Sequence, residues 1–216
     1  MQRVEGVLGR ALGLEGGDDG YATATLAADL ENLVEATLWA VEAGESSTAF
    51  LARRAATELL IRRGPLAQAL DLNRAVAAMP GLNARDQAEI AGIEGWLLAA
   101  HNTPREGLAQ LERSLSADHG DDELKARIFR ASARVLGELG RVLEAVQAAE
   151  RALALDKAAG RAGAMALDLN ARAEQLLILG DTQGAAASLR SAMQLVGERA
   201  PRLRAVLLGT VAATLQ

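Results

Sequence analysis

The sequence predicts an all-α fold, a right-handed superhelical solenoid of stacked helical hairpins. Turn residues recur with gaps of 38, 38 and 40 residues, at Gly64, Asn102, Gly140 and Gly180. Half of the residues are apolar but only 2% are aromatic, and the apolar residues are mostly Ala and Leu, which favour helices. A fixed period of this length is typical of repeat proteins, in which each hairpin buries its apolar face against its neighbours.

Each turn is followed by small or apolar residues at the same offsets. In three hairpins the positions five, nine and twelve residues after the turn are Gly107, Leu111 and Ser114; Ala145, Ala149 and Ala152; and Ala185, Leu189 and Ala192. Small side chains at a helix contact let two backbones approach closely without leaving a cavity. We therefore expect these positions to form the contact between the two helices of each hairpin.

Elements of the first half are predicted from apolar periodicity and from glycine or proline stops. They are a short helix over 2–14, a break at 16–20, and helices over 25–43, 47–63 and 66–79. Core candidates of the 25–43 helix are Leu26, Leu30, Leu33, Leu38 and Val41. Gly64 and Pro65 separate two helices, because glycine ends a helix cheaply and proline suits a first helical turn.

The second half is more regular. Its expected hairpins pair 84–101 with 104–117, 122–139 with 142–157, and 163–179 with 182–196, and a last helix spans 201–215. Asp121, Asp122 and Glu123 are interpreted as a helix cap, since carboxylates favour the positive end of the helix dipole. We expect one repeat domain over 1–216, with an N-terminal helix and linker over 1–20, four to five hairpins over 21–197 and a capping helix over 198–216.

The turn glycine and the small residues after it resemble the tetratricopeptide repeat, although the period exceeds the usual length of about 34 residues. Large aromatic residues are mostly missing; Phe129 and Trp96 alone lie in the first helix of a hairpin, and Arg172 replaces an expected apolar residue. We expect core positions for Trp96 and Trp39, because both lie among apolar residues on a helix.

Longer repeats of this kind resemble the helical sensor region of bacterial signal-transduction ATPases that regulate transcription, of the LuxR and SARP type. Segment 29–44, with Trp39-Ala40 and Gly44, is similar to the start of that region, and 62–70, with Arg62-Arg63-Gly64, to its next hairpin. No Gly-x-x-x-x-Gly-Lys-Ser/Thr loop occurs in the sequence. The resemblance therefore implies a sensor array in signal transduction, without the ATPase and DNA-binding parts.

Composition argues against several classes of function. The net charge is −5, with basic and acidic residues mixed along the chain, which argues against direct nucleic-acid binding. Cysteine is absent, so there is no disulfide, thiolate metal site or cysteine nucleophile. No segment is predicted to span a membrane, and the first residues do not resemble a secretory signal. We expect a cytoplasmic protein.

No catalytic, cofactor or metal site is predicted. His101 and His119 lack a helical histidine or carboxylate partner for a metal, and we expect them at helix ends or in solvent. Segment 16–20 lacks the alternating acidic ligands of a calcium loop. No Gly-x-Ser-x-Gly motif occurs. The chain is therefore predicted not to be an enzyme.

The candidate binding residues lie on first helices of hairpins. Arg127, Arg130 and Arg134 share one helix face, and we expect this face to line the concave groove, with Asn170 and Glu174 on the next hairpin. Arginine forks bind carboxylates bidentately, which predicts an acidic peptide or effector. The alternative is that Arg134 pairs with Glu174 and Arg130 with a carboxylate such as Glu94.

The sequence thus predicts a non-catalytic scaffold that binds a protein or peptide through its groove. The alternative is a homodimer or other self-assembly through the last helix, whose apolar residues are Leu203, Val206, Leu207, Val211 and Leu215.

Overall fold

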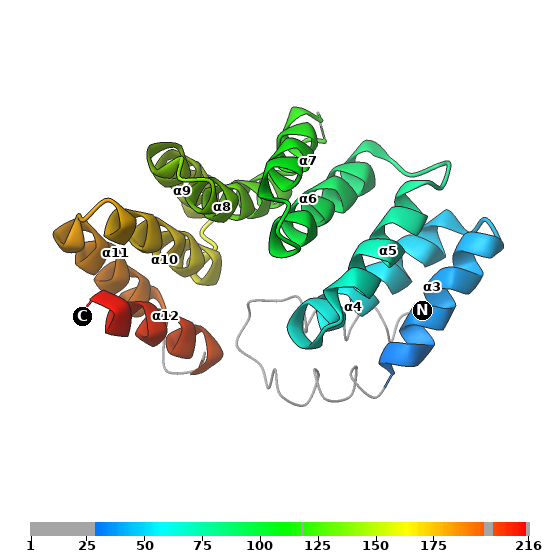
Figure 1. Cartoon of the computed structure of the whole chain (residues 1–216), viewed down its shortest axis with the longest axis horizontal. Coiled ribbons are helices and arrows are strands. Elements are labelled where there is room, and N and C mark those ends of the chain that lie inside the picture. Colours follow the sequence, from blue (N-terminus) through cyan, green and yellow to red (C-terminus); the bar gives the residue numbers. More distant parts are fainter. Residues whose placement is uncertain (1–28, 118, 197–200, 215–216) are drawn as a thin grey trace. The chain divides into compact units, whose positions relative to one another are not determined.

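The computed structural model describes residues 29–117, 119–196 and 201–214, and these residues form ten α-helices with no strand among them. Two compact units divide the chain, at Met1–Gly120 and Asp121–Gln216. Unit 1 contains α3 (Leu30–Glu42), α4 (Ser46–Arg63), α5 (Leu66–Ala77), α6 (Ala84–Ala100) and α7 (Pro104–Ser116) (Figure 1). Unit 2 contains α8 (Asp122–Glu138), α9 (Val142–Ala158), α10 (Ala162–Ile178), α11 (Thr182–Leu195) and α12 (Pro201–Thr214).

The all-α prediction is confirmed, and most helix ends lie within one or two residues of the predicted ones. The predicted start at residue 25 and the short helix over 2–14 lie outside the described residues. That residues 1–216 form one repeat domain stays a prediction. None of the described helices is long and apolar enough to cross a membrane.

The predicted turn residues adopt a left-handed backbone. Their φ angles are 75° at Gly64, 63° at Asn102, 74° at Gly140 and 80° at Gly180. Glycine enters this region without a steric penalty, and asparagine tolerates it better than most residues. Asn102 is the one non-glycine residue with a positive φ within the described residues, so asparagine here has the role that glycine has in the other hairpins.

The contact between the helices of each hairpin is formed as predicted. All nine residues at offsets five, nine and twelve are buried, and the five alanines among them, Ala145, Ala149, Ala152, Ala185 and Ala192, are fully buried. The α4–α5 hairpin has the same arrangement, with Ala69, Asn73 and Val76 fully buried after Gly64. Small residues therefore set the spacing of these hairpins.

The closest approach is between α6 and α7. A Cβ atom built on Gly107 would lie 2.5 Å from the carbonyl oxygen of Gly95 and 3.0 Å from the amide nitrogen of Ala99. A Cβ on Gly95 would lie 2.6 Å from the carbonyl oxygen of Gly107. Because these neighbours are backbone atoms, no side-chain rotation would relieve the overlap, and both positions require glycine.

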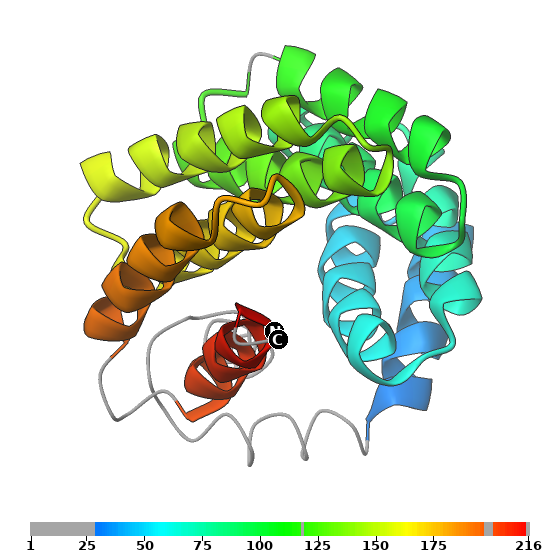
Figure 2. The same ribbon diagram turned by 60° about the vertical axis from the view of Figure 1, so that its left-hand side comes forward.

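Unit 2 has a continuous apolar core that includes its last helix. Figure 2 shows α8 with α9 and α10 with α11 as antiparallel hairpins. The last helix, α12, contacts both α10 and α11. Leu207 is fully buried in this core, and Leu203 and Val211 pack against it. The last helix therefore finds its partner within unit 2, which agrees with a capping role.

The predicted core positions of Leu38 and Trp39 are wrong. Their exposed fractions are 45% and 62%. The buried positions of α3 are instead Thr37 and Ala40. The predicted core residues Leu30, Leu33 and Val41 are partly buried and pack against the core of unit 1. The prediction for Trp96 is confirmed in part, because Trp96 is partly buried and packs against the core of α4, α5 and α6.

We predict that Gly107→Ala lowers the free energy of unfolding by about 1–3 kcal/mol, the usual cost of overpacking. The loss is expected even though alanine has a higher helix propensity than glycine. Gly209→Ala is the control, because a Cβ at Gly209 would meet no atom within 4 Å. The measurement is urea unfolding followed by circular dichroism. Equal stability of the two variants would contradict the close contact of α6 with α7.

Candidate functional site

Arg130 lies in a buried cluster that joins three helices of unit 2. Its Nε donates a hydrogen bond to Asp168 Oδ1 on α10 at 2.6 Å, and its Nη2 donates to Asp156 Oδ2 on α9 at 2.8 Å. The other oxygen of Asp156 accepts from Arg161 Nε at 2.6 Å. Two arginines and two aspartates thus form a connected set, which we call the unit 2 cluster.

The alternative that Arg130 pairs with a carboxylate is confirmed, but the partners differ from the suggested Glu94, which pairs with Arg74, with 3.2 Å between its Oε1 and the arginine Nε. Arg130 binds Asp156 on α9 of its own hairpin and Asp168 on α10 of the next hairpin. The side chain of Arg130 is only 19% exposed. It is therefore positioned to hold α8, α9 and α10 together and has little surface left for a partner.

Asp168 has a strongly raised pKa. Burial, which outweighs the charge and hydrogen bond of Arg130, raises the pKa to about 7, and neighbouring Asp156 acts in the same direction as burial. Its Oδ2 atom is buried and has no hydrogen-bond partner among the described residues. The unit 2 cluster therefore holds a proton at Asp168 more readily than an exposed carboxylate would.

Asn170 and Glu174 lie on α10, which contacts both α8 and α12. Glu174 accepts a hydrogen bond from Asn170 Nδ2 at 2.7 Å. Burial raises the pKa of Glu174, and the Asn170 hydrogen bond, the charge of Arg134 on α8 and a hydrogen bond from Thr210 on α12 oppose that rise. The first helices α8 and α10 and the last helix α12 thus contribute to one polar surface, which we call the α8–α10–α12 surface.

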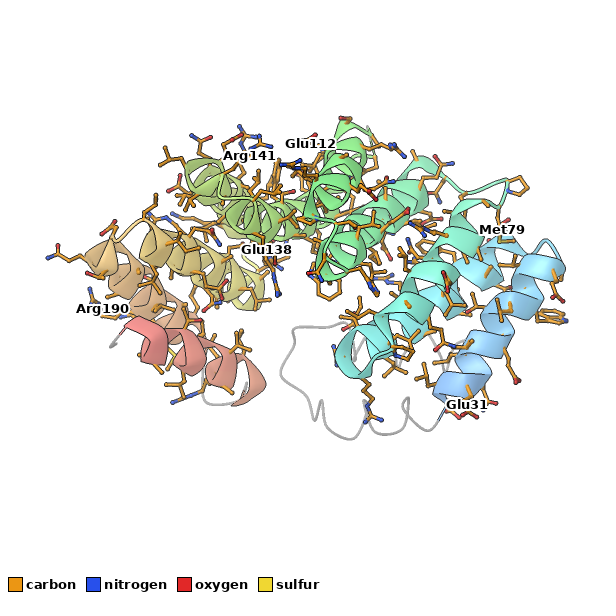
Figure 3. All side chains as sticks on the ribbon, in the orientation of Figure 1. Glu31, Met79, Glu112, Glu138, Arg141 and Arg190 are labelled. Carbon is orange, nitrogen blue, oxygen red and sulfur yellow. The ribbon has the colours of Figure 1, made fainter. Side chains whose placement is uncertain are left out.

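The two remaining arginines of α8 differ in their pairing. Arg134 is 64% exposed, and its Nε lies 3.4 Å from Glu138 Oε1 on the same helix, near the end of α8 (Figure 3). The predicted pairing with Glu174 is supported only as an electrostatic influence of Arg134 on Glu174. Arg127 is partly buried and makes no ion pair among the residues that the structure describes.

A second buried cluster, in unit 1, was not predicted. Arg53 on α4 and Glu89 on α6 are both fully buried, with 3.4 Å between Nη2 and Oε1. Arg53 also donates to Asn73 Oδ1 on α5 at 3.1 Å. Arg54 Nε lies 3.4 Å from Glu89 Oε1, and Arg85 Nη1 lies 3.5 Å from Glu89 Oε2. We call these five residues the unit 1 cluster.

Spacing is the signal that could have revealed the two clusters. Arg53 precedes Glu89 by 36 residues, and Arg130 precedes Asp168 by 38 residues. Both separations are close to the repeat length. A basic and an acidic residue one repeat apart therefore indicate an ion pair between equivalent helices of adjacent hairpins.

The other polar predictions concern helix ends and Arg172. Asp121 caps α8, because its side chain accepts from the amide of Leu124 at 2.9 Å. His101 is exposed at the end of α6. Arg172 bridges two neighbours, with its Nε 3.1 Å from Glu150 Oε1 and its Nη1 2.8 Å from Ser188 Oγ. Asp121 and Arg172 thus have structural partners within unit 2.

Solved structures resemble this fold, whereas no protein-family model and no curated protein matches the chain. One is the crystal structure of BtubC (BKLC) from P. vanneervenii, with a TM-score of 0.67, 15% identity, and coverage of 85% of this chain and 84% of that chain. Another is the crystal structure of YrrB, a TPR protein with an unusual peptide-binding site, with a TM-score of 0.54, 16% identity, and coverage of 97% of both chains. The likeness confirms a tetratricopeptide-like helical-repeat fold.

We predict that the unfolding free energy of the chain decreases as pH rises from about 4 to about 7 because of Asp168. Its pKa in the folded chain is about 7, against an ordinary aspartate pKa of 3.8. In this window the folded chain holds a proton that the unfolded chain has lost, so folding is less favourable at higher pH. Asp168→Asn removes the charge and should flatten this part of the profile, as measured by urea unfolding at pH 5 and pH 8.

Asp122→Asn is the matched control for this experiment, because Asp122 is an exposed aspartate of the same unit. This variant should keep the pH dependence of the native chain. An unchanged pH profile in Asp168→Asn would contradict the assignment of the raised pKa to Asp168.

Proposed function

We propose that the chain is a non-catalytic scaffold that binds a protein or peptide on the α8–α10–α12 surface. The observation that carries this proposal is the hydrogen bond of Asn170 to Glu174 on α10, with the charge of Arg134 on α8 and Thr210 on α12 both acting on the same carboxylate. Arg134 keeps most of its side chain in solvent there. A preformed surface of this kind loses little conformational entropy when a ligand binds.

The side chains have separate roles in this proposal. Arg127 and Arg134 donate hydrogen bonds to carboxylates or carbonyl oxygens of the partner. Glu174 binds polar groups of its backbone or side chains, and buried Asn170 orients the Glu174 carboxylate through its hydrogen bond. Arg130 is a positioning residue, because its hydrogen bonds to Asp156 and Asp168 fix α8 against α9 and α10.

The structural likeness supports a peptide as the partner. YrrB is described as having a peptide-binding site, and its fold spans nearly the whole of this chain. We propose an acidic peptide, because two arginines of α8 are open to solvent in whole or in part. The role as the sensor part of a transcription regulator and the cytoplasmic location stay predictions that follow from the sequence resemblance.

Self-assembly through the last helix has less support than peptide binding. Leu203, Leu207 and Val211 pack into the core of unit 2, which removes them from the surface that a second copy would use. Val206 and Leu208 remain exposed on α12, but nothing else in the described residues indicates what would cover them.

We predict that Arg127→Glu/Arg134→Glu strongly weakens partner binding. The test captures peptides from a lysate of the source cells with the native chain and then measures the dissociation constant of a captured peptide by calorimetry. Two charge-assisted hydrogen bonds contribute about 1.5–3 kcal/mol each, so the double variant should bind more weakly by a factor of about 100 or more.

Arg113→Glu/Arg190→Glu is the matched control, because it makes the same charge change at exposed positions of the second helices α7 and α11. It should bind as the native chain does. Equal affinity of the α8 double variant and the native chain would exclude this surface as the binding site.

A further inference from the structure

The exposed face of α3 combines two large apolar side chains with three carboxylates. Leu38 and Trp39 are 45% and 62% exposed. Glu31, Glu35 and Glu42 are exposed as well, and Figure 3 shows Glu31 at the start of the helix. Residues spaced by three, four or seven positions lie on one side of an α-helix. These five residues therefore form one stripe, which we call the α3 face.

No basic residue balances the three carboxylates of the α3 face. The helix itself contains neither lysine nor arginine, and its glutamates make no ion pair within the part of the chain that the structure describes. By contrast, Glu58 on α4 and Glu94 on α6 each pair with an arginine. Leu38 and Trp39 thus lie between unmatched negative charges. A complementary partner is apolar in the middle and basic at its edge.

The repeat has no described helix in front of α3. In unit 2 each second helix packs on the first helix that precedes it, α9 on α8 and α11 on α10, and the next first helix, α10, packs on α9. Because α4 packs on α3 in that same way, α3 has the place of a second helix. The period of 38 residues from Ser46 to Ala84 places its first helix over 8–25. Three glycines within 16–20 interrupt that range, which disfavours a helix of ordinary length there.

Residues 2–14 have the chemistry that the α3 face requires. The sequence predicts a short helix there, outside the described residues. Arg3 and Arg10 lie seven residues apart at one edge of its apolar side. That side is formed by Val4, Val7, Leu8 and Leu12. The segment is therefore apolar in the middle and basic at one edge.

The spacing of the charges on the two elements also matches. Glu35 and Glu42 are seven residues apart, as are Arg3 and Arg10, and seven residues of helix span about 10.5 Å. When the two helices lie side by side, both arginines can pair with a glutamate at the same time. The apolar residues between the charges then meet in the middle of the contact.

The connection between the segment and α3 is long enough for this contact. It consists of residues 15–28, and an extended chain of that length spans about 45 Å. The helix α3, with 13 residues, is about 20 Å long. The segment can therefore lie along α3 in either direction, and the short connection keeps it at a high effective concentration near its own α3 face.

We propose that residues 2–14 of the same chain dock on the α3 face, with their apolar side over Trp39 and their two arginines beside Glu35 and Glu42. The segment supplies the helix that the repeat lacks in front of α3. This contact belongs to unit 1, whereas the proposed function concerns unit 2. The inference therefore stands or fails separately from the proposed function.

The test measures acrylamide quenching of Trp39 fluorescence in the full chain, with Trp96→Phe as the common background so that Trp39 supplies the whole indole signal. Val7→Glu places a carboxylate in the middle of the contact, close to the carboxylates of the α3 face. We expect the quenching constant of Trp39 to rise about twofold in this variant, because burial of an indole limits the access of a neutral quencher.

Gln2→Glu is the matched control, because it adds the same charge on the opposite side of the predicted helix. It should quench as the background chain does. A second variant, Arg3→Glu/Arg10→Glu, should also expose Trp39. Adding Glu35→Arg/Glu42→Arg to that variant should restore the protection, since the ion pairs form again with reversed charges. Circular dichroism checks the fold of every variant.

Two results would overturn the proposal. One is equal quenching of Trp39 in the background chain, in Val7→Glu and in Arg3→Glu/Arg10→Glu, which would leave the α3 face open to a different partner. The other is protection of Trp39 that appears only as the chain concentration is raised, since a second copy would then supply the segment.

Discussion

Close approach of the two helices within each hairpin is the constraint on which the rest of the structure depends. In the α6–α7 hairpin the two backbones meet at Gly95 and Gly107, with no space for a side chain. In the later hairpins fully buried alanines such as Ala145 and Ala185 have the same role. This spacing brings the second helix near the arginines of the first, so that side chains as short as Asp156 and Asn73 reach them.

Polar clusters then connect one hairpin to the next. Arg53 and Arg130 each bridge to the following first helix and so join hairpins that small residues have already closed. Burying such charges costs desolvation free energy, and breaking one partner of a buried pair is typically far more costly than removing an exposed pair. The clusters therefore favour one register of neighbouring hairpins over another, which apolar alanine faces alone would specify poorly.

Local signals in the sequence predict the helices and their turns well. Gly140 and Gly180 mark turns because a positive φ angle leaves few alternatives to glycine, and the alanines after them mark the close helix contact because size alone decides packing there.

Whether a single side chain is buried or exposed is harder to predict from the sequence. Arg130 and Arg134 share a helix face, yet one lies in a buried cluster and the other in solvent. The difference depends on carboxylates of other helices, whose positions cannot be predicted from the periodicity of α8. The prediction for Trp39 is wrong for a related reason, since the buried residues of α3 are Thr37 and Ala40.

The distribution of tryptophan has a practical consequence. The chain contains two tryptophans, and both, Trp39 and Trp96, belong to unit 1. Among the described residues Trp39 is largely exposed and Trp96 is partly buried, so the indole emission of the intact chain is a mixture of two fluorophores in different surroundings. Unit 2 contributes no indole signal. Intrinsic fluorescence therefore follows unit 1 alone, and comparison with far-ultraviolet dichroism, to which both units contribute, distinguishes concerted from separate unfolding of the two units without any engineered label.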